Sequence, residues 1–239
     1  MHKESTMVIC KKTDIGILMR NNFQGTAVSQ YAVTLLQALT SFSSQYNIKI
    51  VTDDEDSINE QYPRLGHSTF QYREKWKYLR ALSLFVDLNN PHLYFESEDI
   101  RETTKLLLLP YPSTFGIQIS QPYIVVIHDL MHKEYPHLPE FPLKERIYRD
   151  IIYRQSSKKA EAVVVDSEIG KEQLISYYNI PEKKIFVIPY IPPKYIYDYS
   201  NMEISQVKSF LVKYKLPEKF LFYPAQFWPH KNHINLLKA

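Results

Sequence analysis

The feature that most constrains the fold is an alternation of short, continuous apolar runs with longer segments of helical periodicity. The apolar runs lie at 14–19, 48–52, 105–110, 123–129, 161–167 and 183–190. Between the first two, apolar residues recur at Val28, Tyr31, Leu35, Leu36 and Leu39, which is helical spacing. Continuous apolar strands that alternate with helices predict an α/β fold, in which a parallel sheet is covered by helices on both faces.

The same periodicity predicts helices at 27–42, 141–160, 168–179 and 203–216. The stretch 57–100 is the hardest to assign, and we place one helix in it, at 73–88. The acidic residues 53–56 are interpreted as a solvated turn after the second strand.

The chain is predicted to divide into three parts. Residues 1–190 form the first domain, 191–216 are a linker with a short helix, and 217–239 begin a second α/β domain. In this last part, 220–225 is predicted to be a strand and 233–239 the start of a helix. A lone strand and half a helix cannot bury their apolar faces, so we expect the second domain to be incomplete.

Composition excludes several classes of protein. The net charge of +3 is too small to indicate nucleic-acid binding, and the five glycines form no GxGxxG fingerprint. Cys10 is the single cysteine, so no internal disulfide can form. The N-terminus has no signal-peptide pattern, and no apolar run approaches the ~20 residues of a membrane span. We therefore expect a cytoplasmic protein.

Residues that follow the strands are the candidate ligand contacts, because parallel sheets bind ligands at the carboxyl ends of their strands. His128 is interpreted as a polar contact to a ligand, and Asn22, Asp129 and Ser167 are further candidate contacts. His128, Asp129 and His132 could also suggest metal ligands. The sequence offers no third or fourth ligand with supporting partners, so we expect no metal site.

Two loops are candidates for binding an anion. Gly25 and Thr26 lie between a strand and a helix, where free N–H groups at the helix start favour anions, although a glycine there can serve the turn alone. In the second loop, Lys231 near a helix start is a candidate phosphate partner, and the alternative is a solvated lysine. Trp228 in that loop could equally pack at a domain junction.

Three stretches together resemble glycosyltransferases of the GT-B fold, and among these the retaining family 4. They are YIVVIHDLMHKEYP, AEAVVVDSEIGKEQLISYYNIPEKKIFVIP and FLFYPAQFWPHKNHINLLKA. The resemblance implies two Rossmann-like lobes that face each other, the first on the acceptor side and the second binding a nucleoside diphosphate sugar. It also implies retention of the anomeric configuration and no required metal or other cofactor.

Carried over residue by residue, the resemblance implies a role for each matching position. His128 would contact the transferred sugar, and Gly25 and Thr26 would lie beside the donor phosphates and that sugar. Lys231 would neutralise the leaving diphosphate, and Asn22, Asp129 and Ser167 would lie on the acceptor side. Gln226 stands where the family often has arginine, which weakens this phosphate clamp, and the family's acidic E-x7-E segment does not occur before Ala239.

The resulting hypothesis is a glycosyltransferase of polysaccharide biosynthesis in the cell envelope. It would move a hexose, such as mannose or glucose, from a nucleoside diphosphate sugar to a glycan or a lipid-linked acceptor. Peripheral contact with the inner membrane surface is a further expectation, and binding of nucleic acid is not expected. Residues 1–239 alone are expected to show little turnover. The alternative is a non-catalytic lobe that binds a glycan or a partner and needs a separate donor-lobe chain.

Overall fold

The computed structural model describes residues 12–20, 26–71, 82, 84, 104–192, 196–197 and 202–239. The strands in these ranges are β1 (Thr13–Leu18), β2 (Tyr46–Thr52), β3 (Gly66–Thr69), β4 (Leu106–Leu109), β5 (Tyr123–Ile127), β6 (Ala162–Val165) and β7 (Ile185–Val187). The α-helices are α1 (Ala27–Thr40), α2 (Glu55–Gln61), α5 (Thr114–Gln118), α6 (Met131–Glu134), α7 (Leu143–Lys159), α8 (Glu168–Tyr178), α10 (Ile204–Lys213) and α11 (His233–Lys238). Short 3-10 turns, η4 (Glu182–Lys184) and η5 (Pro229–Lys231), complete the elements.

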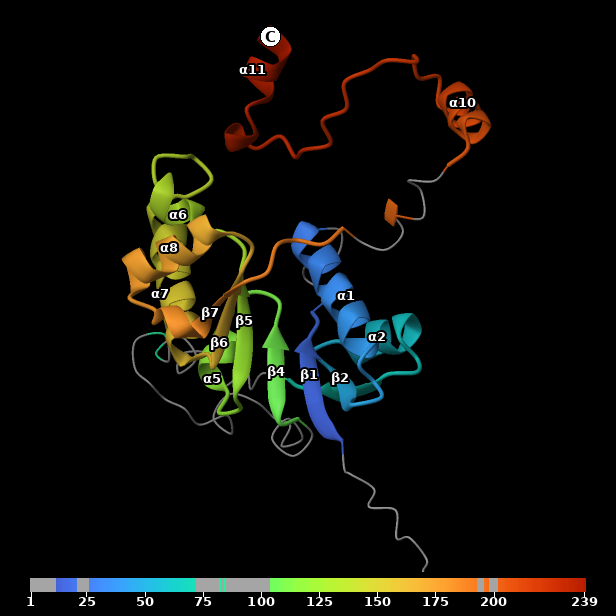
Figure 1. Ribbon diagram of the computed structural model, residues 1–239. Coiled ribbons are helices and arrows are strands. Elements are labelled where there is room, and N and C mark those ends of the chain that lie inside the picture. Colours follow the sequence, from blue (N-terminus) through green and yellow to red (C-terminus); the bar gives the residue numbers. More distant parts are fainter. Residues whose placement is uncertain are drawn as a thin grey trace, which may run out of the picture. The chain divides into compact units, whose positions relative to one another are not determined.

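The strands form one 7-stranded sheet in the order β3-β2-β1-β4-β5-β6-β7. Every neighbouring pair is parallel. The chain builds outward from β1 in one direction, returns to the other side of β1 with β4, and then builds outward again (Figure 1). This confirms the predicted Rossmann-like α/β class and places the reversal of strand order between β1 and β4.

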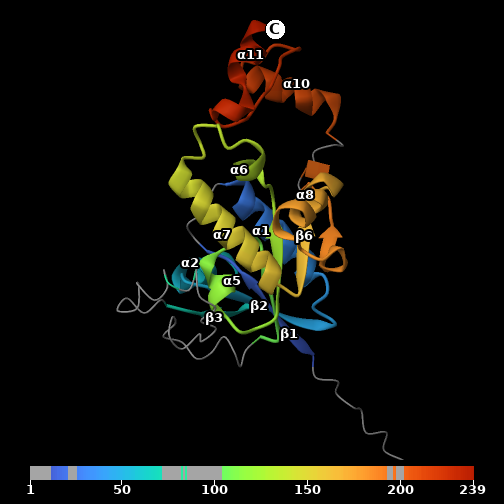
Figure 2. The same ribbon diagram turned by 90° about the vertical axis from the view of Figure 1, so that its left-hand side faces the viewer.

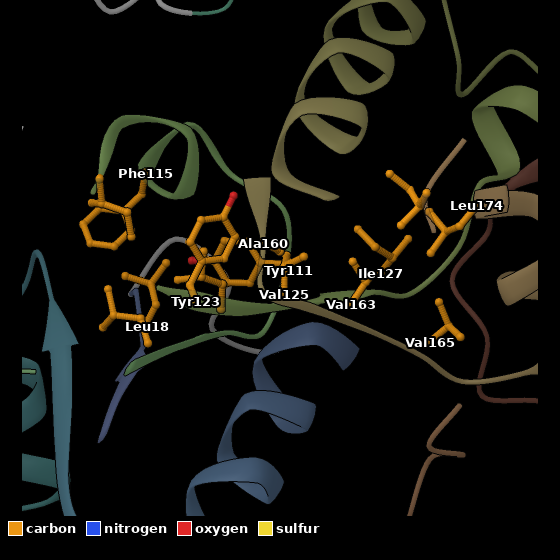
Figure 3. Close-up of a cluster of buried hydrophobic side chains, with 14 of the residues drawn as sticks. Leu18, Tyr111, Phe115, Tyr123, Val125, Ile127, Ala160, Val163, Val165 and Leu174 are labelled. Atoms are coloured by element: carbon orange, nitrogen blue, oxygen red, sulfur yellow. The ribbon is translucent and has the colours of Figure 1, made fainter. Parts of the chain in front are cut away.

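Both faces of the sheet carry a hydrophobic core. Successive side chains of a strand point to opposite faces, so neighbours on β1 enter different clusters. Ile17 packs in a cluster with Leu36 of α1. Leu18 packs in the other cluster with Phe115 of α5, and Figure 3 shows α1 and α5 on opposite sides of the strands there. Figure 2 shows α5 and α7 lying over the same face of the sheet. Coverage of both faces explains why the strands read as continuous apolar runs.

The acidic run 53–56 differs from its predicted form. The run was predicted to be a turn, but α2 begins within it, at Glu55. The side chain of Asp54 caps this helix by accepting a hydrogen bond from the backbone N of Ser57 at 3.2 Å. Glu55 and Asp56 then occupy the first turn, where the helix dipole favours negative charge.

The chain folds into two compact units. One consists of Met1–Leu130 and Tyr148–Pro189, and the other of Met131–Ile147 and Tyr190–Ala239. The second unit includes α6, α10, η5 and α11. The predicted division at residues 190 and 216 stays a prediction.

The strand predicted at 220–225 is wrong. These residues have no regular structure, and Leu221 and Phe222 are 93% and 76% exposed. A strand needs a neighbour to satisfy its backbone N–H and C=O groups, and the described part of the second unit contains no other strand. The helix predicted to start at residue 233 is confirmed as α11.

Other differences are local. The strand predicted at 183–190 is limited to Ile185–Val187, and η4 precedes it. Nearly all of the helix predicted at 73–88 lies outside the described residues. Among the described helices, none is long and apolar enough to cross a membrane.

Candidate functional site

Polar residues gather where the parallel strands end. His128 follows β5 directly, and Asp166 and Ser167 follow β6. Arg20 and Asp53 follow β1 and β2 at the same edge of the sheet. Because strand order reverses between β1 and β4, this edge is where an open α/β sheet binds its ligands. Because all strands are parallel, the residues that follow them lie at the same edge of the sheet; their contact with a ligand stays a prediction.

His128 is held by the neighbouring strand end. Its Nε2 atom lies 2.7 Å from the carbonyl oxygen of Pro110, which follows β4. A carbonyl only accepts, so Nε2 must carry the proton and donate it in this bond. Burial lowers the pKa of His128, against smaller opposing effects of this hydrogen bond and of the carboxylates of Asp129 and Asp166. His128 is thus a neutral imidazole of defined tautomer near pH 7, which offers hydrogen bonding rather than charge.

Tyr31 packs against His128 from the helix that follows β1. The two ring centroids are 5.2 Å apart and the ring planes meet at 86°, an edge-to-face contact. Burial, and then the nearby carboxylate of Asp166, raise the pKa of Tyr31. The phenol therefore stays neutral at this edge of the sheet.

Sequence reasoning missed both Tyr31 and Asp166. Tyr31 was interpreted only as an apolar position of the helix, because periodicity does not show which residue faces the end of another strand. Asp166 could have been found, since it follows β6 as directly as His128 follows β5.

Arg20 and Asp53 form an ion pair between the ends of β1 and β2. The Nε and Nη2 atoms of Arg20 lie 2.6 and 2.5 Å from Oδ2 of Asp53. The two side chains are 18% and 24% exposed. The pair connects two strand ends.

Two of the predicted site residues cap helices. The hydroxyl oxygen of Thr26 accepts a hydrogen bond from the backbone N of Ser29 at 3.2 Å and begins α1. Ser167 begins α8 in the same way, accepting from Gly170 N at 3.2 Å. Helix capping is a structural role, and it accounts for a threonine and a serine at these two positions without any ligand.

The structure gives less information about three other residues that were predicted to belong to the site, Asn22, Gly25 and Asp129. Asp129 is exposed beside His128. Asn22 and Gly25 lie outside the described residues.

Gln226 and Lys231 belong to the second compact unit. The amide oxygen of Gln226 accepts a hydrogen bond from Trp228 Nε1 at 2.7 Å, so this oxygen is occupied. Lys231 ends η5 and is exposed. Within the described ranges, no group of three or more His, Cys, Asp or Glu residues could hold a metal ion.

Comparison with known proteins gives the family. The profile described as Glycosyltransferase Family 4 matches residues 28–190, which is more than half of the chain. Among solved structures, a glycosyltransferase from Rickettsia africae ESF-5 is similar at a TM-score of 0.51 and 12% identity, over 88% of this chain and 51% of its own. Anabaena HepE, solved in complex with UDP and glucose, is similar at a TM-score of 0.52 and 12% identity, over 84% of this chain and 50% of its own. No curated protein matches the chain.

The parallel sheet, its strand order and the polar residues at its carboxyl edge define a Rossmann-like α/β lobe. The chain belongs to glycosyltransferase family 4. It spans about half the length of the two solved structures.

Proposed function

We propose that the chain contributes the acceptor-side lobe of an enzyme that transfers a hexose from a nucleoside diphosphate sugar. The proposal rests above all on one observation, the neutral and oriented His128 at the carboxyl end of β5. Family membership supports the class of reaction.

His128 would act on the transferred sugar through hydrogen bonds. Its Nε2–H is committed to Pro110, so the orientation of the ring is set before substrate arrives. Preorganised dipoles of this kind need no rearrangement when charge develops in the transition state. Because the imidazole is neutral, it would position sugar hydroxyls without attracting the anionic diphosphate to the wrong place.

The donor would be bound through its diphosphate. Lys231 would neutralise the negative charge on the leaving nucleoside diphosphate, as a compact cation suited to phosphate. Gly25 and Thr26 would lie beside the donor phosphates, and Gln226 would contribute an amide donor where a second cation would be stronger. The HepE complex holds UDP and glucose, which makes UDP-glucose the first donor to test.

The finer assignments are part of the same proposal. The acceptor would be a glycan or a lipid-linked sugar of cell-envelope polysaccharide synthesis, contacted through Asn22, Asp129 and Ser167. The reaction would retain the anomeric configuration, require no metal and take place in the cytoplasm, with peripheral contact to the inner membrane.

The test is a transfer assay on the full gene product. It is incubated with radiolabelled UDP-glucose or GDP-mannose and a membrane extract as acceptor source, and sugar incorporation is followed with and without a metal chelator. Incorporation from one donor, insensitive to the chelator, is the expected result. If there is no incorporation and no release of nucleoside diphosphate, but the protein binds glycans, the non-catalytic alternative replaces the proposal.

A further inference from the structure

Glu140 contacts the loop that carries Lys231, although the two lie far apart in sequence. Its Oε1 atom accepts two hydrogen bonds from His230, one from the backbone N at 3.1 Å and one from the ring Nδ1 at 2.8 Å. The side chain of Glu140 is only 7% exposed. Both residues belong to the second compact unit.

The contact fixes the chemical state of both partners. A carboxylate only accepts, so Nδ1 of His230 carries a proton. Burial alone would raise the pKa of Glu140, but the hydrogen bonds from the His230 ring and backbone outweigh burial and lower it. Glu140 is therefore ionised near pH 7 and makes two charge-assisted hydrogen bonds.

The backbone of Lys231 is fixed on its other sides as well. Its N–H donates to the carbonyl oxygen of Trp228 at 2.9 Å. The hydroxyl of Tyr223 donates to its carbonyl oxygen at 2.9 Å. Lys231 itself is exposed, and in the part of the chain that the structure describes no ion pair holds its ammonium group. A fixed backbone thus presents a cation to solvent.

We propose that Glu140 is a positioning residue that, through His230, holds Lys231 in place for the diphosphate of a nucleotide sugar. This inference rests on the proposed function of Lys231. Without Glu140, the N–H and ring of His230 lose their shared acceptor, and the ligand must then order this side of the loop. Ordering a loop at the moment of binding costs affinity, which preorganisation avoids.

The structure supplies a conservative variant. Only Oε1 of Glu140 is used by His230, and within the described residues the buried Oε2 atom has no hydrogen-bond partner. Glu140→Gln keeps an oxygen that can accept both bonds, whereas Glu140→Ala removes it. Glu218→Ala is the matched control, because Glu218 is an exposed acidic residue of the same unit.

The experiment is calorimetric titration of the full gene product with inorganic diphosphate and with UDP. Lys231→Ala and Glu140→Ala should each weaken binding, Glu140→Ala by about tenfold, the equivalent of one to two hydrogen bonds. Glu140→Gln should stay within about threefold of the parent, and Glu218→Ala should match it. Circular dichroism of each variant shows whether it is folded. If Glu140→Ala does not fold, Glu140→Gln still tests the inference, because weak binding by this variant would overturn it.

The outcomes separate the inference from the function on which it rests. If Lys231→Ala binds both probes as the parent does, the proposed role of Lys231 fails and the inference with it. If Lys231→Ala binds weakly but Glu140→Ala binds normally, the inference alone is overturned. The same result follows if Glu140→Gln is as weak as Glu140→Ala, because the charge rather than the positioning would then matter.

A second readout does not depend on ligand binding. Nitrogen-15 NMR of the His230 ring in the full gene product should show a protonated Nδ1 in the parent and in Glu140→Gln. Loss of this signal in Glu140→Ala is expected. An unprotonated Nδ1 in the parent would contradict the contact itself.

Discussion

The Nε2 atom of His128 lies 2.7 Å from the carbonyl oxygen of Pro110, so the residue after β5 is tied to the residue after β4. Strand order reverses between β1 and β4, and this hydrogen bond joins the end of β4 to the end of the next strand, β5. It holds the ring in one tautomer, and burial keeps that ring uncharged. A neutral, oriented imidazole at this edge is the central feature of the proposed site.

The neutral state of His128 predicts how stability depends on pH. Its pKa is lowered in the folded protein, so below the ordinary histidine value of ~6.5 the unfolded chain binds this proton first. Protons then favour unfolding, and the free energy of unfolding falls as pH drops from 6.5 toward the lowered pKa. The slope from this one group cannot exceed about 1.4 kcal/mol per pH unit.

Urea unfolding at pH 7.5 and pH 5.5 measures this effect. His128→Gln can still donate to Pro110 but has no group that titrates in this range, so its stability should fall less between the two pH values. The pKa values of Glu140 and Glu182 are also lowered, but these groups change stability below the ordinary glutamate value of ~4.3, outside the interval from pH 7.5 to pH 5.5. An equal loss in parent and variant would show that His128 is not kept neutral by burial.

Gly16 is predicted to be required by packing on β1. A Cβ atom added there would lie 2.7 Å from Leu107 Cδ2 and 2.8 Å from Thr104 Cγ2. Leu107 is fully buried, so it has no solvent to move into. Gly16→Ala should lower the free energy of unfolding by about 1–3 kcal/mol, as overpacking does.

Gly66 provides the matched control on β3. A Cβ atom at Gly66 would meet nothing nearer than Lys49 Cγ at 3.6 Å, an ordinary contact. Gly66→Ala should therefore leave the urea midpoint unchanged or raise it slightly. Equal destabilisation of both variants would refute the packing argument.

Tyr123 is predicted to contribute one buried hydrogen bond. Its side chain is 1% exposed, and its hydroxyl donates to the carbonyl oxygen of Ser156 on α7 at 2.9 Å. That oxygen also accepts from Ala160 N at 3.0 Å, so it keeps a partner when the hydroxyl is removed. Tyr123→Phe should then cost only about 0.5–1.5 kcal/mol in the free energy of unfolding.

Tyr46→Phe is the control for that measurement, because Tyr46 is 37% exposed at the start of β2. Its urea midpoint should not change by more than experimental error. A cost for Tyr123→Phe above about 3 kcal/mol would mean that Ser156 is left without a partner after all.

The strands and main helices could be predicted because their apolar residues are continuous or periodic. Strand β3 could not be predicted from the sequence, since its sequence GHST is polar and it pairs only with β2 at the sheet edge. The strand predicted at 220–225 shows the opposite case, in which a suitable sequence has no neighbouring strand in the described part of its unit.

The candidate site was predictable only where position along the chain defined it. His128 was identified because it follows a strand. Its edge-to-face contact with Tyr31 depends on how α1 packs, which periodicity does not specify. The contact between Glu140 and His230 joins residues 90 positions apart and leaves no local pattern.

The most direct test of the central claim is the rate of sugar transfer by the full gene product and its His128→Ala variant. His137→Ala is the control, because His137 is exposed on the loop after α6. The account predicts that His128→Ala lowers kcat/KM by about 100-fold, as loss of a preorganised dipole does, while His137→Ala transfers sugar at the parent rate. Equal transfer by the parent and His128→Ala would contradict the claim that His128 acts on the transferred sugar.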